Sequence, residues 1–366
     1  MSPLEVLIRE RIAKTGLIPV AGFMELALGH PEYGYYMTED PFGTKGDFIT
    51  APEISQVFGE LIGLWAAVTW QQLGSPDRLI VIECGPGRGT LMNDLLRAAK
   101  LVPDFHKAIE IHLVETSPAM RRRQKATLSD DAPTWHDTIT TVPAGPTILV
   151  ANEFLDALPI HQFVMTDAGW AERCVDVGPD GFSFVAGALA PDGLPVMSST
   201  ALPGTIFETC PAAMAFAGAL TKRFGAAPGE APGAALIIDY GHEKSATGET
   251  LQAVHNHKFT DPLADPGKAD MTAHVDFDAF GRQLISGGAL AIGPITQSTF
   301  LSAIGIRERT QQLAHNASPD ARADMESATA RLIEPAQMGE LFKVMVATSA
   351  EMPRLAGFES WVEEPC

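Results

Sequence analysis

The sequence predicts an α/β protein built on a doubly wound, mostly parallel sheet. Two observations carry this prediction. From residue 78 onward, short apolar runs alternate with segments of helical spacing, and the first run ends in a glycine-rich turn. The runs are "RLIVIE", "AIEIHLVE", "TILVANE" and "GAALIIDYG", and "PTWHDTI" offers a further short strand. "GGALAIGPIT" and "LFKVMVAT" are the last predicted strands.

Helical patterns precede this sheet, and a different pattern interrupts it. Residues 1–75 are predicted to form a helical N-terminal cap that includes a long polar substrate loop. Residues 76–350 are predicted to be the α/β core, and residues 351–366 a C-terminal tail. Within the core, residues 160–233 show short alternating runs broken by Asp-Gly and Gly-Pro turns, and then a helix. This pattern predicts an insertion of antiparallel hairpins.

The composition limits the classes of partner. Of 366 residues, 46% are hydrophobic, and 45 acids against 26 bases give a net charge of -19. That charge would repel a phosphate backbone, so nucleic acid is not an expected partner. The one basic cluster, residues 121–123, is expected to lie on a solvated helix face. No apolar run has the length of a membrane span, and no signal peptide is recognised, so a cytoplasmic location is expected.

Metal and disulfide chemistry are also not expected. The four cysteines form no Cys-x-x-Cys pair, and "HNH" at residues 255–257 lacks a nearby third ligand.

The glycine turn "ECGPGRGT" is the first candidate binding element. Gly85, Gly87 and Gly89 follow a G-x-G-x-G spacing, whereas dinucleotide-binding folds use G-x-G-x-x-G. This difference does not by itself identify the ligand. Glu83 at the strand end favours a cationic ligand, because a carboxylate there would repel a pyrophosphate. S-adenosylmethionine carries an ammonium and a sulfonium and has no phosphate. It is therefore the predicted cofactor.

Two further acids fit an adenosine ligand. Glu115 ends the next strand, where a carboxylate can accept hydrogen bonds from both ribose hydroxyls, although it could instead serve the dipole of the following helix. Asp137 follows the possible third strand and could reach the adenine amino group, or be a surface turn acid. Both residues are candidates for cofactor binding.

Acidic and amide side chains mark the candidate reaction site. Asn152, Glu153 and Asp156 follow the fourth strand, at the sheet edge where open α/β proteins bind ligands. Carboxylates there could orient a guanidinium, because a carboxylate accepts an arginine in bidentate fashion. Helix capping is the alternative. Asp47 and Glu53, in "GDFITAPEIS", are further candidates, although this stretch also reads as an ordinary helix start.

Several motifs occur together in the order of a known family. They are "GYYMTEDPFGTKGDFITAPEISQVFGELIG", "ECGPGRGTLMNDLL", "HLVETSP", "NEFLDALPIHQF" and "IIDYGH". Together they resemble the MidA-like methyltransferases, over residues 5 to 350. The glycine motif is shared by many methyltransferases, whereas "GDFITAPEIS" and "NEFLDALP" are far more specific.

The resemblance implies a class I S-adenosylmethionine-dependent fold. It also implies a protein partner: the expected reaction is dimethylation of an arginine of the 49 kDa-type subunit of respiratory complex I, or of its bacterial counterpart, in support of its assembly. Residues 83, 85, 87 and 115 match the family's cofactor positions, and residues 152, 153 and 156 match its motif after the fourth strand.

Other functions stay open at this point. A nicotinamide-dependent oxidoreductase would also use a glycine turn and a ribose acid. An assembly chaperone could keep the fold without catalysis. A methyltransferase for small molecules or nucleic acid is a further alternative.

Overall fold

The computed structural model describes residues 1–38, 49–190, 201–224, 231–349 and 355–359. Asp47, a candidate site residue, lies outside the described residues. The chain divides into two compact units, and the larger comprises Ile49–Leu155, Phe216–Glu243 and Ala279–Cys366. The smaller comprises Met1–Phe48, Asp156–Ala215 and Lys244–Asp278.

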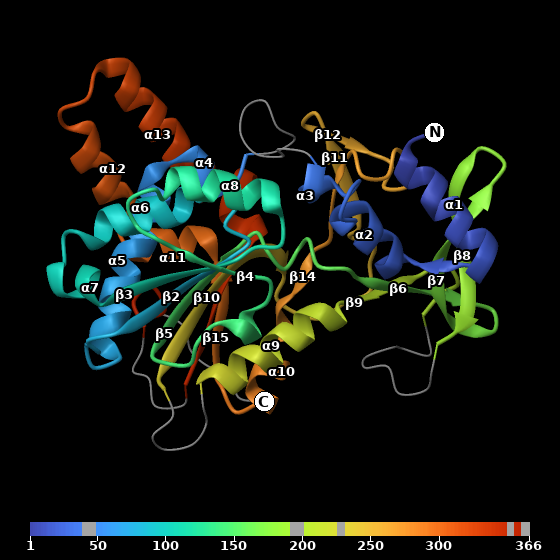
Figure 1. The fold of residues 1–366 in the computed structure, drawn as a ribbon, viewed down its shortest axis with the longest axis horizontal. Helices are drawn as coiled ribbons and strands as arrows, with labels where there is room; N and C mark the ends of the chain where they lie inside the picture. Colours follow the sequence, from blue (N-terminus) through green and yellow to red (C-terminus); the bar gives the residue numbers. More distant parts are fainter. Residues whose placement is uncertain (39–48, 191–200, 225–230, 350–354, 360–366) are drawn as a thin grey trace. The chain divides into compact units, whose positions relative to one another are not determined.

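A mostly parallel sheet forms the centre of the larger unit, as predicted (Figure 1). Its strands lie in the order β15-β16-β10-β5-β2-β3-β4. Their bounds are β2 Leu79–Cys84, β3 Ile109–Val114, β4 Thr134–His136, β5 Thr147–Asn152, β10 Gly233–His242, β15 Leu290–Thr296 and β16 Phe342–Thr348. The pairs from β10 through β5, β2 and β3 to β4 are parallel, whereas β16 is antiparallel to both β10 and β15.

The strand order reverses between β2 and β5. From β2 the chain continues to β3 on one side, and it later returns to place β5 on the other side. Ligands in open α/β sheets bind outside the carboxyl ends of the strands at such a reversal. The segments that follow Cys84 and Asn152 therefore occupy the expected binding position.

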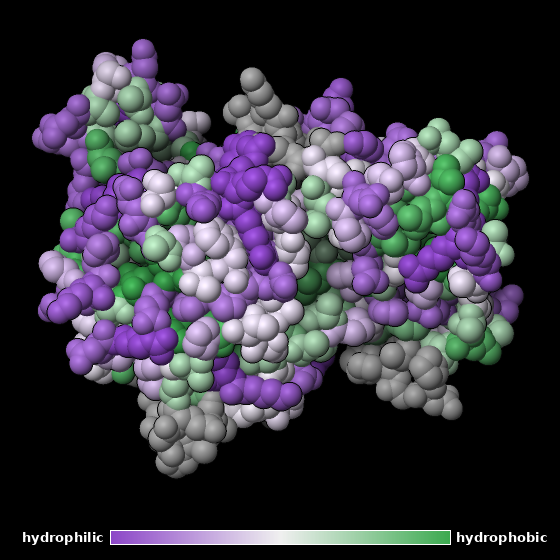
Figure 2. All heavy atoms as spheres, viewed as in Figure 1, coloured by the Kyte–Doolittle hydropathy of each residue, from purple (hydrophilic) through white to green (hydrophobic). Residues whose placement is uncertain are grey.

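Helices join and cover these strands. Their bounds are α4 Ala51–Ile54, α5 Gln56–Gln72, α6 Thr90–Ala99, α7 Pro103–Ala108, α8 Pro118–Thr127, α9 Pro211–Phe224, α10 Phe277–Ser286, α11 Gln297–Ala303, α12 Ile306–Ala314 and α13 Pro319–Ile333. A 3₁₀ turn, Ile139–Thr141, and a π turn, Pro335–Gly339, complete the set. Figure 2 shows hydrophilic side chains over α8, and Arg122 and Arg123 there are exposed. The arginine triplet thus lies on a largely solvated helix, as predicted.

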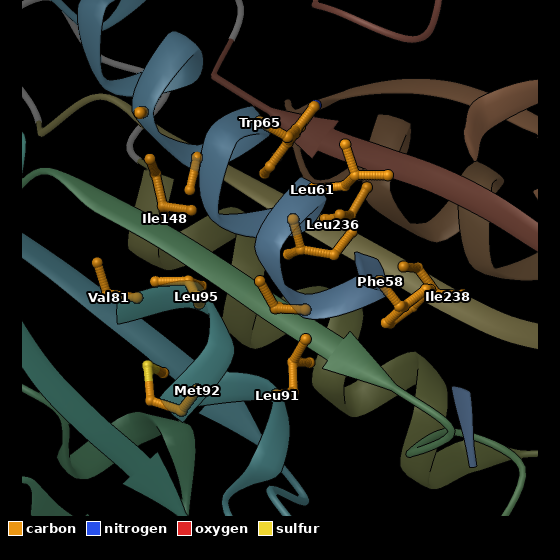
Figure 3. Close-up of a cluster of buried hydrophobic side chains, with 14 of the residues drawn as sticks. Phe58, Leu61, Trp65, Val81, Leu91, Met92, Leu95, Ile148, Leu236 and Ile238 are labelled. Carbon is orange, nitrogen blue, oxygen red and sulfur yellow. The ribbon is translucent and has the colours of Figure 1, made fainter. Parts of the chain in front are cut away.

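The core beside the binding edge is a contact between α5, α6 and the sheet. Figure 3 shows Phe58, Leu61 and Trp65 of α5 among side chains of α6 and of the strands. Glycines on α5 make this contact close: a Cβ on Gly63 would lie 2.6 Å from the Leu95 carbonyl oxygen. Because α6 begins directly after the glycine turn, this packing fixes the turn against the sheet.

The smaller unit contains helices and antiparallel sheets. The helices are α1 Pro3–Thr15, α2 Val20–Gly29 and α3 Tyr35–Thr38. One sheet has the order β1-β7-β6-β9, with β8 on β7, and the other has the order β12-β11-β13. The strand bounds are β1 Ile18–Pro19, β6 His161–Thr166, β7 Gly169–Gly178, β8 Gly181–Leu189, β9 Ile206–Thr209, β11 Gln252–His255, β12 Lys258–Thr260, β13 Asp270–Thr272 and β14 Val275–Asp276.

The antiparallel pairing of β6 through β9 confirms the predicted β-rich insertion. The predicted domain boundaries stay a prediction. No helix among the described residues is long and apolar enough to cross a membrane.

Candidate active site

The glycine turn after β2 requires a left-handed backbone at each of its three glycines. Gly85, Gly87 and Gly89 have φ values of 63°, 50° and 84°. L side chains rarely adopt this conformation, so glycine is the residue that fits. A Cβ on Gly85 would also lie 3.1 Å from Cδ2 of Phe154. The turn is therefore in close contact with the segment that follows β5.

Glu83 lies at the end of β2 and is only 3% exposed. One hydrogen bond reaches its carboxyl group from the backbone N–H of Met92, near the start of α6. Its Oε2 is buried and has no hydrogen-bond partner among the described residues. Burial raises the pKa of Glu83 to about 8, because removal from water disfavours the charged form. A cation beside this carboxyl group would favour its ionisation.

Glu115 follows β3 and is held by donors at the start of α8 and within it. Its Oε1 accepts from the backbone N–H of Ser117 at 2.7 Å, and its Oε2 accepts from the side chain of Gln124 at 3.0 Å. Burial raises the pKa of Glu115, and these two hydrogen bonds act in the opposite direction. The carboxylate of Asp137 is 78% exposed and pairs with Arg121 at 2.6 Å. Thus Glu115 is held by hydrogen bonds on both carboxyl oxygens, whereas Asp137 forms an ion pair at the surface.

The segment after β5 carries a strained acid. Glu153 has φ 51°, a left-handed conformation that is costly for a residue with a side chain. Its Oε1 accepts from the side chain of Asn152 and from the backbone N–H of Ala51, each at 3.1 Å. Asn152 is itself buried, and its Oδ1 has no partner among the described residues. These contacts orient Glu153 at the edge where the strand order reverses.

Asp239 explains how the strained backbone is held. This fully buried carboxylate accepts hydrogen bonds from the backbone N–H groups of Phe154 and Leu155, at 3.1 and 2.9 Å. The backbone N–H of Glu153 donates to the Ile238 carbonyl at 2.9 Å. The end of β10 therefore fixes the chain just after β5, so "IIDYGH" supports "NEFLDALP".

The end of the early loop joins the same site. Glu53 of α4 accepts from the hydroxyl of Thr90 at 2.6 Å, and its other oxygen lies 3.6 Å from Arg88. Thr90 and Arg88 belong to the glycine motif. Through Glu53 and Ala51, the segment "TAPEIS" is thus tied to both the glycine turn and Glu153.

Asp156 is the remaining candidate reaction residue among the described residues. It belongs to the smaller unit, is 6% exposed, and its backbone carbonyl accepts from Ala273. Its charge contributes to the raised pKa of Tyr36, whose hydroxyl donates to Asp270 at 2.6 Å. Of the candidate reaction residues, the larger unit therefore brings together Asn152, Glu153 and Glu53.

Several residues with clear positions in this site are absent from the sequence prediction. Gln124 and Thr90 are the main ones. Gln124 carried a usable signal, because it is a polar residue between Met120 and Leu128 at the spacing of a buried helix face. The contact of Thr90 with Glu53 joins residues 37 positions apart, and no local pattern announces it.

Comparison with protein families decides the class of ligand. Residues 61–294 match the family described as "Putative S-adenosyl-L-methionine-dependent methyltransferase". The chain belongs to this methyltransferase family. This membership confirms the predicted resemblance, fold and cofactor class. It also selects S-adenosylmethionine over the nicotinamide cofactor that the glycine turn alone left open.

Full-length relatives agree with this assignment. The methyltransferase is 37% identical to the zebrafish (Danio rerio) protein named "Protein arginine methyltransferase NDUFAF7, mitochondrial", over 91% of this chain and 84% of the relative. The human protein of that name is 36% identical, over 91% and 80% of the two chains. These eukaryotic relatives are named mitochondrial, and the cytoplasmic location expected for this chain stays a prediction.

Solved structures share the same fold. One is the crystal structure of a Burkholderia thailandensis protein, described as a COG1565 superfamily member and likely methyl transferase, with bound S-adenosyl-homocysteine. It matches this chain with a TM-score of 0.85 and 29% sequence identity. The match covers 98% of this chain and 95% of that chain.

The residues of the methyltransferase fit the donor on their own chemistry. Glu83 offers a buried, unsatisfied carboxyl oxygen to a cation, and Gly85, Gly87 and Gly89 have no side chain that would obstruct a close approach to the backbone. Glu115 offers acceptors suited to a ribose diol. In contrast, the side chain of Asp137 is engaged with Arg121 at the surface. Its predicted contact with adenine stays a prediction, as do the roles of the other site residues.

Proposed function

We propose that this methyltransferase dimethylates an arginine side chain of a protein, and that this protein is the 49 kDa-type subunit of respiratory complex I or its bacterial counterpart. Support comes first from the relatives named protein arginine methyltransferase, which match over most of both chains. The motifs "GDFITAPEIS" and "NEFLDALP", on which the family resemblance depends, also supply the contacts around Glu153. A role in assembly of the complex belongs to the same proposal.

The observation that carries the proposal is the strained, oriented carboxylate of Glu153. Backbone strain of this kind clusters at functional sites, because the surrounding structure must compensate for it. Here Asp239 and Ile238 hold the backbone, while Ala51 and Asn152 hold one carboxylate oxygen. A carboxylate in this position suits a guanidinium, whose planar N–H groups match carboxylate geometry.

Three glutamates of the site have different parts in the proposed reaction. When bound, S-adenosylmethionine supplies an electrophilic methyl group on its sulfonium. Glu83 faces the cationic end of the donor, and Glu115 binds the ribose. Glu153 aligns the acceptor guanidinium and stabilises its charge, and it lies at the sheet edge to take the proton that the nitrogen loses. Most of the rate enhancement then comes from positioning and electrostatics.

Substitution of Glu153 tests this assignment. Glu153→Gln keeps the shape and removes the charge, so we expect turnover to fall by about a hundredfold or more while donor affinity stays within roughly twofold. Initial rates with labelled donor and calorimetry with S-adenosylhomocysteine measure the two quantities. The matched control is Glu110→Gln, which removes an exposed acid of β3 that pairs with Arg78, and it should leave both unchanged. Full turnover by Glu153→Gln would refute the role.

A further inference from the structure

Gln124 is a fully buried amide on α8, the helix that follows Glu115. Its neighbours one turn away on the same face, Met120 and Leu128, are buried apolar side chains. A polar group at such a position is costly unless each of its hydrogen-bonding atoms is satisfied. Its contacts therefore show what it does.

The amide of Gln124 forms hydrogen bonds with three separate segments near the carboxyl ends of the strands. Its Nε2 donates to the Gly87 carbonyl at 2.8 Å and to Oε2 of Glu115 at 3.0 Å. Its Oε1 accepts from the indole N–H of Trp135 in β4 at 2.8 Å. One side chain thus connects the glycine turn, the end of β3 and β4.

These contacts determine the orientation of the Glu115 carboxyl group. With Oε2 bound by Gln124 and Oε1 by the Ser117 N–H, the carboxylate has one orientation. Burial raises the pKa of Glu115, and the amide donor of Gln124 counteracts this by favouring the charged form. Without that donor, the group would be protonated at a higher pH and would accept hydrogen bonds less well.

We propose that Gln124 is a positioning residue for the nucleoside half of the methyl donor: it keeps the Glu115 carboxyl group in one orientation, and it ties the glycine turn to that acid. The proposal rests on the proposed role of Glu115 in ribose binding. It does not depend on which acceptor is methylated. In this proposal Gln124 acts on the donor through Glu115 and Gly87, the two groups to which its Nε2 donates.

The test replaces Gln124 with an apolar side chain of similar length. Gln124→Met should weaken the binding of S-adenosylhomocysteine about ten- to a hundredfold, because the hydrogen bond to the Glu115 carboxyl group is lost. Methylthioadenosine has the nucleoside without the amino acid, and its binding should be weakened by the same factor. At saturating donor, kcat should stay close to that of the unmodified protein.

The pH profile separates positioning from loss of packing. The profile is measured with methylthioadenosine, because it lacks the ammonium that would face Glu83. Its binding should decline as the pH falls through the pKa of Glu115, on which the Arg121 guanidinium also acts, since a protonated acid accepts fewer hydrogen bonds. In Gln124→Met this decline should begin at a higher pH. The matched control is Gln297→Met, which removes another fully buried amide, bound to the Leu332 carbonyl on α13. The control should leave affinity and its pH profile unchanged.

A double-mutant cycle completes the experiment. If Gln124 acts through Glu115, then Gln124→Met should have little further effect on affinity in a Glu115→Gln background. Additive effects, or an affinity and pH profile in Gln124→Met equal to those of Gln297→Met, would overturn the proposal. If Glu115→Gln alone left S-adenosylhomocysteine affinity unchanged, the ribose assignment itself would fail, whereas the proposed arginine acceptor would still stand.

Discussion

Glu83 shows how one residue can link burial to the charge of a ligand. Its carboxyl group is nearly excluded from water, and burial raises its pKa to about 8. At pH 7 the neutral form is therefore favoured, and the argument from sequence, which treats Glu83 as a fixed negative charge, holds only when a cation is close. The sequence does not show this dependence on the neighbour, because it arises from the burial of Glu83 in the folded chain.

Donor binding should for this reason release a proton. A cation beside Glu83 lowers its pKa, so a group protonated at neutral pH ionises on binding. We expect release of up to about one proton near pH 7, decreasing above roughly pH 9, where the carboxyl group is already ionised. Calorimetry with S-adenosylmethionine in buffers of different ionisation enthalpy measures this number.

Glu83→Gln provides the decisive comparison. The variant cannot ionise, so the release should disappear, and affinity should fall because the ammonium or sulfonium loses its counter-charge. Glu110→Gln serves again as the matched control. The same proton release in Glu83→Gln would show that another group titrates on binding.

At the scale of elements, the contact between α5 and α6 supports the glycine turn. Gly59 and Gly63 allow the two helices to approach, and a Cβ on Gly63 would meet backbone atoms of Leu95 at 2.6 and 2.9 Å. Gly63→Ala should therefore reduce the free energy of unfolding by about 1–3 kcal/mol, the usual cost of overpacking. Denaturant titration measures this change.

Another helical glycine gives the opposite expectation. Gly218 in α9 has open space where a Cβ would lie. Gly218→Ala should stabilise the protein by about 0.5–1 kcal/mol, because alanine loses less backbone entropy on folding. Equal effects from the two substitutions would contradict the packing argument.

Elements differ in how far the sequence predicts them. The buried strands and the glycine turn are local patterns, and each was predictable from apolar runs and glycine spacing. The direction of β16 was not, because it depends on pairing with β10 and β15, which are distant in the chain. Helices α12 and α13 are also absent from the sequence prediction, although Ser318 and Pro319 form a usable helix start.

For the whole molecule, the candidate site depends on contacts between distant segments. Residues 102 positions apart meet where Ala51 donates to Glu153, and 85 positions separate Phe154 from Asp239. The sequence supplied the chemistry of each motif, since acids and glycines have recognisable roles. It could not supply their convergence, nor the separation of Asp156 into the smaller unit.

The central claim is that this protein transfers methyl groups to an arginine of a protein acceptor. The most direct measurement incubates the purified chain and labelled S-adenosylmethionine with purified complex I subunits, and maps the modified residue by mass spectrometry. We predict label on an arginine of the 49 kDa-type subunit, incorporated about a hundredfold or more slowly with Glu153→Gln. If the donor bound but no arginine in any subunit was labelled, the claim would be contradicted, and a non-catalytic assembly role or another acceptor would replace it.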